Sequence, residues 1–208
     1  MTYSIDHIVI AVSDLARAID DFYNRTGVRP VTGGRHTSLG TMNALIGLDS
    51  GAYLELITID MDTQVEPPRW MGVDLITEPR ITRWALKSYD IHRDASLLHA
   101  HDPSLAAVQT GRRLMTSGDT LEWSLTMPLP SPMIEVAPFF LDWTRSVHHP
   151  SDKLDSICTL MSIKLHHPTP KRYLPLMDDV GFGDRLFRSQ TPSIEVEIDS
   201  PRGIINLR

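Results

Sequence analysis

The sequence has very little cysteine, and this scarcity excludes two classes of protein. Cys158 is the only cysteine among 208 residues, so the chain has no internal disulfide and no zinc motif built on paired cysteines. Its neighbours Ile157 and Leu160 are apolar, which favours a small buried side chain over a reactive nucleophile. The composition is therefore typical of a protein from a reducing compartment.

Clusters of positive charge and long apolar runs are also missing. The formal net charge is -6, and no run of Lys or Arg is longer than Arg112-Arg113, so the chain lacks the basic patch of a nucleic-acid-binding protein. The apolar run at residues 8–12 is too short to cross a bilayer. We therefore expect a cytoplasmic protein with no nucleic-acid partner and no membrane partner.

The residues that are present predict a folded protein that begins with a β-α-β-β-β module. Hydrophobic residues make up 41% of the chain and charged residues 22%, as in ordinary globular proteins. Residues 5–12 are apolar on both faces of a strand, and an amphipathic helix follows, with Ser13 as the expected N-cap and Gly27 as its end. Three strand candidates come next, at residues 28–31, 42–48 and 52–59.

Two later segments have a similar order of predicted elements. Residues 158–208 predict a strand at 160–165, a helix that stops at Gly181, and strands at 185–188, 193–198 and 203–207. The middle segment predicts a strand at 81–89, a short helix at 95–101 and a half-buried strand at 121–127. We expect one compact unit of three modules, at residues 1–60, 61–157 and 158–208. The sequence leaves open which later module pairs with the first.

His7 and Glu55 each occupy the centre of an apolar strand in the first module. If the predicted helix packs on Ile8 and Ile10, His7 points to the opposite face of the sheet. A buried carboxylate such as Glu55 is costly unless it is paired, protonated or bound to a metal. In a purely structural role, His7 would be a hydrogen-bonded histidine of the core and Glu55 would belong to an ion pair. Together they would also supply two ligands for Zn, Fe, Mn or Ni.

Several stretches of the chain resemble a known superfamily. The opening IDHIVIAVSDLARAIDDFY and the later YLEL resemble the vicinal oxygen chelate superfamily, which includes glyoxalase I and the extradiol dioxygenases. Further stretches are similar to glyoxalase-like domain proteins within it: Gly34-Arg35-His36, residues 40–45, Trp84-Ala85-Leu86, Leu121-Glu122-Trp123, residues 138–143 and His149-Pro150-Ser151. The resemblance implies an α+β fold. In it, repeated β-α-β-β-β modules form a U-shaped, partly open β-barrel around a ligand cavity, with helices outside.

The resemblance also implies a divalent metal site. His7 and Glu55 match the usual ligands of a first module, and Glu55 is also the candidate catalytic residue. The later modules offer no clear counterpart of His7, because Met161 or Ser162 aligns with it in one module and Arg83 or Trp84 in the other. Glu195 and Glu197 could be the counterpart of Glu55 or the solvated face of an alternating strand. The third candidate ligand is His149, which resembles the family's His-Pro motif, with His36 next. An ordinary loop residue before proline is the alternative for His149.

Six residues are candidates for contact with a substrate. They are Arg35, His36, Asn43, Trp84, Arg112 and Trp123. Asn43 and the two arginines would fix a polar or anionic group by hydrogen bonds, although a turn amide and two solvated arginines would have the same sequence pattern.

Three functions are consistent with this pattern. The first is a divalent-metal-dependent enzyme, of lyase, isomerase or dioxygenase type, that acts on a small molecule with vicinal oxygens. The second is a metal-free protein that binds or sequesters a small molecule on the same fold. The third is a degenerate domain whose cavity mainly serves pairing in a homodimer. The fold alone does not choose among these functions.

Overall fold

The computed structural model describes residues 3–114 and 120–208 and contains the β-α-β-β-β order twice before residue 143. The first set comprises β1 (Ile5–Ala11), α1 (Leu15–Thr26), β2 (Val31–His36), β3 (Thr41–Gly47) and β4 (Tyr53–Ile59). The second comprises β5 (Arg80–Ser88), α2 (Ile91–His101), β6 (Val108–Leu114), β7 (Thr120–Thr126) and β8 (Phe139–Asp142).

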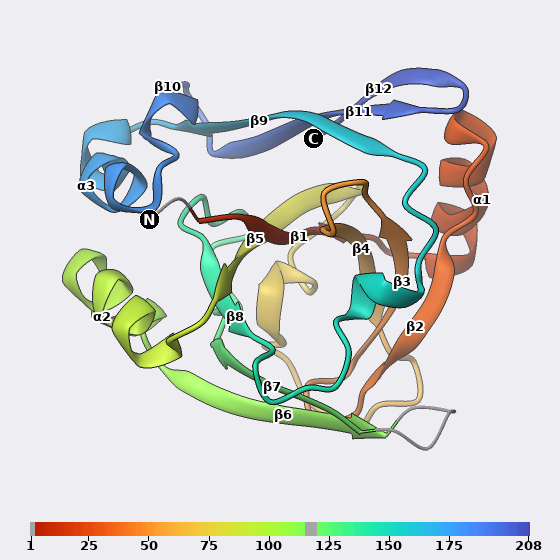
Figure 1. The fold of residues 1–208 in the computed structure, drawn as a ribbon, viewed down its shortest axis with the longest axis horizontal. Coiled ribbons are helices and arrows are strands. Elements are labelled where there is room, and N and C mark those ends of the chain that lie inside the picture. The colour runs from red at the N-terminus through yellow and green to blue at the C-terminus, as the bar shows by residue number, and fades with distance from the viewer. Residues whose placement is uncertain (1–2, 115–119) are drawn as a thin grey trace.

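These strands form one curled sheet of eight strands in the order β2-β3-β4-β1-β5-β8-β7-β6 (Figure 1). β1 and β5 lie antiparallel at its centre, and each pairs in parallel with the last strand of its own set, β4 or β8. The sheet curves into a half-barrel, so the predicted α+β fold with a partly open barrel is confirmed. The strand that pairs with β1 across the centre comes from the middle of the chain.

The C-terminal segment forms a second sheet. It comprises β9 (Thr159–His167), α3 (Pro170–Val180), β10 (Leu186–Arg188), β11 (Ser193–Ser200) and β12 (Gly203–Leu207). The sheet order is β10-β9-β11-β12, with β9 parallel to β10 and antiparallel to β11. In the first set, by contrast, the opening strand is parallel to the last strand. The element order therefore recurs, but the strand pairing does not.

The second sheet covers the outer face of the half-barrel (Figure 1). Ile163 and Val196 belong to the same buried cluster as Ile8, Leu54 and Trp84 of the first sheet. Burying these apolar side chains between the sheets removes them from water, which stabilises the layered arrangement.

Four short 3-10 helices complete the fold. They are η1 (Trp70–Gly72), η2 (Pro103–Leu105), η3 (Pro150–Lys153) and η4 (Gly183–Arg185). η1 lies inside the half-barrel, where Trp70 and Met71 pack against Val9 and Ile57. Within residues 3–114 and 120–208, no helix is long and apolar enough to span a bilayer.

The two faces of β1 separate as the sequence alternation predicts. Ile8 and Ile10 share an outer cluster with Leu15 and Phe22 of α1, while Val9 belongs to the inner cluster. His7 therefore faces the concave side of the sheet, where it lines a pocket.

Two boundaries near the start of the chain differ from the sequence prediction. The N-cap of α1 is Asp14 rather than Ser13, because the Asp14 side chain accepts the hydrogen bond from the Arg17 N–H. The strand expected at residues 28–31 begins at Val31, since Pro30 lacks an N–H and the Thr26 hydroxyl holds Val28 in the turn after the helix.

Gly33 and Gly34 lie inside β2, although two consecutive glycines are typical of a turn. A side chain at Gly33 would collide with the Asn43 carboxamide on β3, and the pairing of β2 with β3 is irregular at this point. Because Gly33 has no side chain, the Asn43 carboxamide fits beside it on the inner face of the sheet.

Candidate functional site

The candidate site is a pocket on the concave side of the half-barrel, with about 540 Å³ of space when its opening to solvent is included. Its wall is rich in aromatic side chains: Tyr53, Trp70, Trp123, Phe139 and Trp143. Its polar side chains are His7, His36, Asn43 and Glu55. A mostly apolar pocket with a few converging polar groups is the usual form of a small-molecule site.

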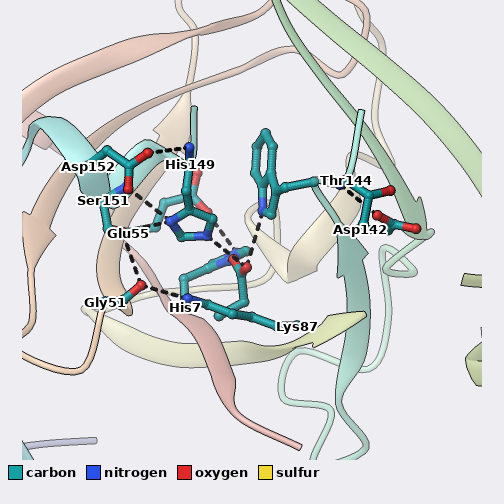
Figure 2. A network of polar contacts seen from close by, with 11 residues as sticks. His7, Gly51, Glu55, Lys87, Asp142, Thr144, His149, Ser151 and Asp152 are labelled. Carbon is teal, nitrogen blue, oxygen red and sulfur yellow. Dashed lines mark hydrogen bonds and ion pairs between the residues drawn. The ribbon is translucent and has the colours of Figure 1, made fainter. Parts of the chain in front are cut away.

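His7 and Glu55 are neighbours at the polar end of this pocket (Figure 2). β1 and β4 pair in parallel, which brings His7 Nε2 to 3.5 Å from Glu55 Oε2. The imidazole stacks on Tyr53 at 4.7 Å and meets the edge of Phe139 at 5.3 Å. Two aromatic contacts and a buried position therefore fix the plane of the ring.

The two nitrogens of His7 have different surroundings. Nδ1 lies 2.7 Å from Asp6 Oδ1, and an ionised carboxylate only accepts hydrogen bonds, so Nδ1 carries a proton. Nε2 is buried, and among the described residues it has no hydrogen-bond partner, because the contact with Glu55 lacks the required geometry. An unsatisfied buried nitrogen at a pocket wall is a mark of a functional site.

Asn43 orients the Glu55 carboxylate. Its Nδ2 donates to Glu55 Oε1 at 2.5 Å, and its Oδ1 accepts from the Gly34 N–H at 2.8 Å. The second bond fixes which end of the amide faces Glu55. The other oxygen of Glu55 is left toward His7.

Asp6 lies behind His7 and is fully buried. Its Oδ2 accepts from Trp143 Nε1 at 3.1 Å and lies 3.0 Å from His149 Nε2. Burial alone would raise the pKa of Asp6, but the hydrogen bonds with His149 and His7 outweigh it and hold the pKa at about 2. Asp6 is therefore a buried, ionised carboxylate.

The sequence analysis did not identify Asp6 as a site residue. Strict alternation along β1 assigns Asp6 to the face opposite His7. The pairing of β1 with β5 is irregular between Ile5 and His7, and such a bulge redirects a side chain. The available signal was an acidic residue next to His7 in an apolar strand.

The sequence model of a family described as a glyoxalase-like domain matches residues 5–181. The chain belongs to the glyoxalase-like domain family. The match confirms the resemblance to glyoxalase-like domain proteins that the motifs predicted.

Several solved structures are similar to this chain at low sequence identity, and the first of them shares its fold. A hypothetical protein from Staphylococcus aureus has a TM-score of 0.66 at 15% identity, over 99% of each chain. Methylmalonyl-CoA epimerase from Mycobacterium tuberculosis has a TM-score of 0.42 at 18% identity, over 66% of this chain and 85% of that one. The Streptomyces coelicolor epimerase in complex with 2-nitronate-propionyl-CoA has a TM-score of 0.44 at 17% identity, over 69% and 99%. No curated protein matches the sequence.

The donors of this glyoxalase-like domain do not complete a metal centre with three protein ligands. The spacing of His7 Nε2 and Glu55 Oε2 suits two ligands of one ion. His149, the expected third ligand, is turned toward Asp6 and Ser151. In the part of the chain that the structure describes, no group of three or more His, Cys, Asp or Glu side chains is placed to hold a metal ion.

Strand pairing shows which residues of β5 and β8 occupy the positions that match His7 and Glu55. Val9 pairs with Glu55 on β4, and Ala85 pairs with Phe139 on β8. Arg83 precedes Ala85 by two residues, as His7 precedes Val9, so Arg83 and Phe139 occupy the matching positions. The buried Arg83 guanidinium donates to the carbonyls of Thr82, Leu129, Pro132 and Met133. Neither replacement is a metal ligand.

Three of the six predicted substrate contacts meet in the pocket. His36, Asn43 and Trp123 all line it. His36 Nδ1 lies 3.0 Å from Thr41 Oγ1, and its ring meets the edge of Trp70 at 5.3 Å. Trp123 stacks obliquely on Trp143 at 5.4 Å.

The other three predicted contacts lie elsewhere. Trp84 is buried on the outer face because it alternates with the inward-facing Ala85, and its Nε1 donates to the Val136 carbonyl. Arg35 is half-exposed and forms ion pairs with two carboxylates outside the pocket. Arg112 is exposed and pairs across strands with Glu122. None of the three lines the pocket, so their positions do not support the predicted contact.

Sequence reasoning also missed part of the pocket wall. Trp70 and Met71 come from the connector between β4 and β5, which carried no strand or helix pattern. A pair of large apolar residues inside a Pro-rich connector was the available signal.

Proposed function

We propose that this glyoxalase-like domain is an enzyme that transfers a proton on a small, mostly apolar molecule, and that it does so without a protein-bound metal. The observation that carries the proposal is the buried, unpartnered His7 Nε2 at the polar end of the pocket, 3.5 Å from Glu55 Oε2. A base must reach the proton it removes and must be free to accept it. His7 Nε2 has no hydrogen-bond partner among the described residues, and its side chain lines the pocket.

The residues around His7 supply the rest of the chemistry. Asp6 accepts the Nδ1 hydrogen, so the Nε2 lone pair faces the pocket. In the proposed step, Nε2 takes a proton from a carbon beside a carbonyl group, and the electron pair of the broken C–H bond moves to the carbonyl oxygen. The imidazolium that forms lies between the carboxylates of Asp6 and Glu55, which stabilise its charge. Returning the proton to the same carbon regenerates the ketone. In an α-hydroxy ketone the proton can instead go to the former carbonyl carbon while the hydroxyl proton moves to the former carbonyl oxygen, which completes an isomerase-type reaction.

The pocket favours an uncharged ligand with a flat or branched apolar body. Trp123, Phe139 and Tyr53 offer aromatic faces for contact. Lys and Arg side chains are missing from its lining, so within the described residues nothing in the pocket would neutralise a strongly anionic group.

The test is exchange of carbon-bound hydrogen in D2O, followed by proton NMR with EDTA present. The probes are neutral ketones with an acidic C–H bond, for example 2-hydroxyacetophenone and hydroxyacetone. We expect the wild type to catalyse exchange, and His7→Ala to reduce it by about 100-fold or more, the usual contribution of a general base. Equal exchange by wild type and His7→Ala would contradict the proposal, and binding without exchange would favour a sequestering protein.

A divalent-metal enzyme is the second candidate. The observation in its favour is the spacing of His7 Nε2 and Glu55 Oε2, which would suit one ion whose other positions are filled by substrate oxygens. The same exchange assay separates the two candidates. Exchange that EDTA abolishes and added Zn or Mn restores would favour the metal enzyme.

A further inference from the structure

We propose that Asp6 is a positioning residue that holds the imidazole of His7 and one wall of the pocket in a single arrangement. The wall segment is residues 143–151, which follow β8. The proposal rests on the proposed function only where it calls His7 the base. The arrangement itself is a property of the unliganded protein and can be tested without a substrate.

Donors from separate parts of the chain converge on the Asp6 carboxylate. His7 Nδ1 lies 2.7 Å from Oδ1, while Trp143 Nε1 lies 3.1 Å and His149 Nε2 3.0 Å from Oδ2. In Figure 2, His149 and His7 come from different elements and meet in this network. Asp6 has no exposed surface, so water does not replace a lost partner. Each donor therefore depends on this one carboxylate.

The first consequence concerns the protonation pattern of His7. A neutral imidazole carries its proton on Nδ1 or on Nε2, and the partner of one nitrogen decides which form is present. Asp6 selects the Nδ1–H form, which leaves Nε2 without a hydrogen and directed at the pocket. Without Asp6, the Nε2–H form would be stabilised by the neighbouring Glu55 carboxylate, and Nε2 could no longer accept a proton.

The second consequence concerns the pocket wall. Trp143 and Pro150, which belong to the wall segment, line the pocket, and the Trp143 ring meets the His149 ring edge-on at 5.6 Å. The Ser151 hydroxyl donates to the Gly51 carbonyl at 3.0 Å, which fixes the far end of the segment to the turn before β4. The near end is fixed to the sheet through Asp6. The base and the wall therefore share one support.

The first test measures the tautomer of His7 by nitrogen-15 NMR in mildly alkaline buffer. We expect the wild type to show the Nδ1–H form. Asp6→Asn should raise the Nε2–H form to a major fraction, because a carboxamide has one acceptor oxygen for three donors. An unchanged tautomer ratio in a folded Asp6→Asn protein would overturn the proposal.

The second test keeps Asp6 intact and follows hydrogen exchange of the Trp143 indole N–H. His149→Ala removes one partner of Asp6 and loosens the wall segment, so we expect exchange to accelerate by about tenfold or more, as for loss of a hydrogen bond to a charged group. His148→Ala is the matched control, because His148 precedes His149 but is not among the hydrogen-bond partners of Asp6 in the described part of the chain. Equal exchange in His149→Ala and wild type would also overturn the proposal.

The two tests separate this proposal from the proposed function. Both are made on the unliganded protein, so they report on Asp6 whether or not the ketone probes exchange. If the tautomer and indole results hold and no exchange occurs, Asp6 positions a histidine that is not a base. If exchange occurs while both NMR results fail, His7 is a base that Asp6 does not position.

Discussion

At the scale of single residues, the site depends on buried polar groups that support one another. Asn43 turns one oxygen of Glu55 toward His7, and Asp6 turns one nitrogen of His7 toward the pocket. Each of these side chains is at most 5% exposed, so their contacts are made in surroundings where an unpaired polar group is costly. The result is an imidazole held by neighbours on all sides except the one facing the ligand space.

The ionised state of Asp6 predicts a specific dependence of stability on pH. The pKa of Asp6 is lowered from 3.8 to about 2 in the folded protein, so its contribution is complete above about pH 4 and is lost as the pH falls through about 2. We expect roughly 2 kcal/mol to disappear over this range in the wild type. The measurement is the free energy of unfolding in urea at a series of pH values. An equal loss of stability in Asp6→Asn over the same range would contradict this assignment.

The sequence predicted His7 and Glu55 because each interrupts an apolar strand. It did not predict Asp6, because strict alternation hides the effect of a bulge at that position. The resemblance led to the prediction that Trp84 contacts the ligand, although the alternation of β5 places that side chain on the outer face of the sheet. The broken pattern therefore identified two side chains that line the pocket, whereas Asp6 was missed where the backbone departs from regular pairing.

At the scale of secondary structure, local signals determined the elements, and tertiary contacts set their ends. α1 ends at Gly27 as the sequence predicts, because the backbone there has a φ of 79° that favours glycine. The start of the same helix was misplaced by one residue, since Ser13 and Asp14 are both good N-caps. β2 was misplaced because its glycines make room for Asn43 rather than forming a turn.

The start of α1 gives a prediction with a built-in control. Asp14→Ala removes the acceptor for the Arg17 N–H, so we expect the free energy of unfolding to fall by about 1 kcal/mol. Ser13→Ala, one residue earlier, should cost much less. Urea unfolding of the two variants beside the wild type provides the measurement. A larger cost for Ser13→Ala would show that the helix begins there instead.

At the scale of the whole molecule, two sheets share one core. Ile163 on β9 is 1% exposed and belongs to the cluster that contains Trp84, whereas Met161 on the same strand is 53% exposed. The sequence predicted the recurrence of the element order in the last segment. It could not predict the pairing, because β10 and β11 bind opposite edges of β9, an arrangement that the chain order does not reveal.

The shared core predicts that the two sheets unfold together. All four tryptophans precede β9, and Trp70, Trp123 and Trp143 line the pocket on the concave side of the first sheet, so their fluorescence reports on that sheet. Trp84 also contacts Phe182 of the C-terminal segment. Ile163→Ala should lower the unfolding midpoint seen by fluorescence, at a cost of about 2–5 kcal/mol, although the change lies in the second sheet. Met161→Ala should have little effect. A fluorescence midpoint that Ile163→Ala leaves unchanged would mean that the sheets unfold independently.

The central claim is that His7, with Glu55 beside it, transfers a proton on the ligand without a protein-bound metal. Its most direct test is elemental analysis of protein that has been purified without an affinity tag, before and after incubation with Mn, Fe, Zn or Ni and removal of unbound metal. We expect far less than one metal ion per chain in the wild type, because only two donors face one another at the site. One bound ion per chain in the wild type, absent in His7→Ala and Glu55→Gln, would contradict the claim.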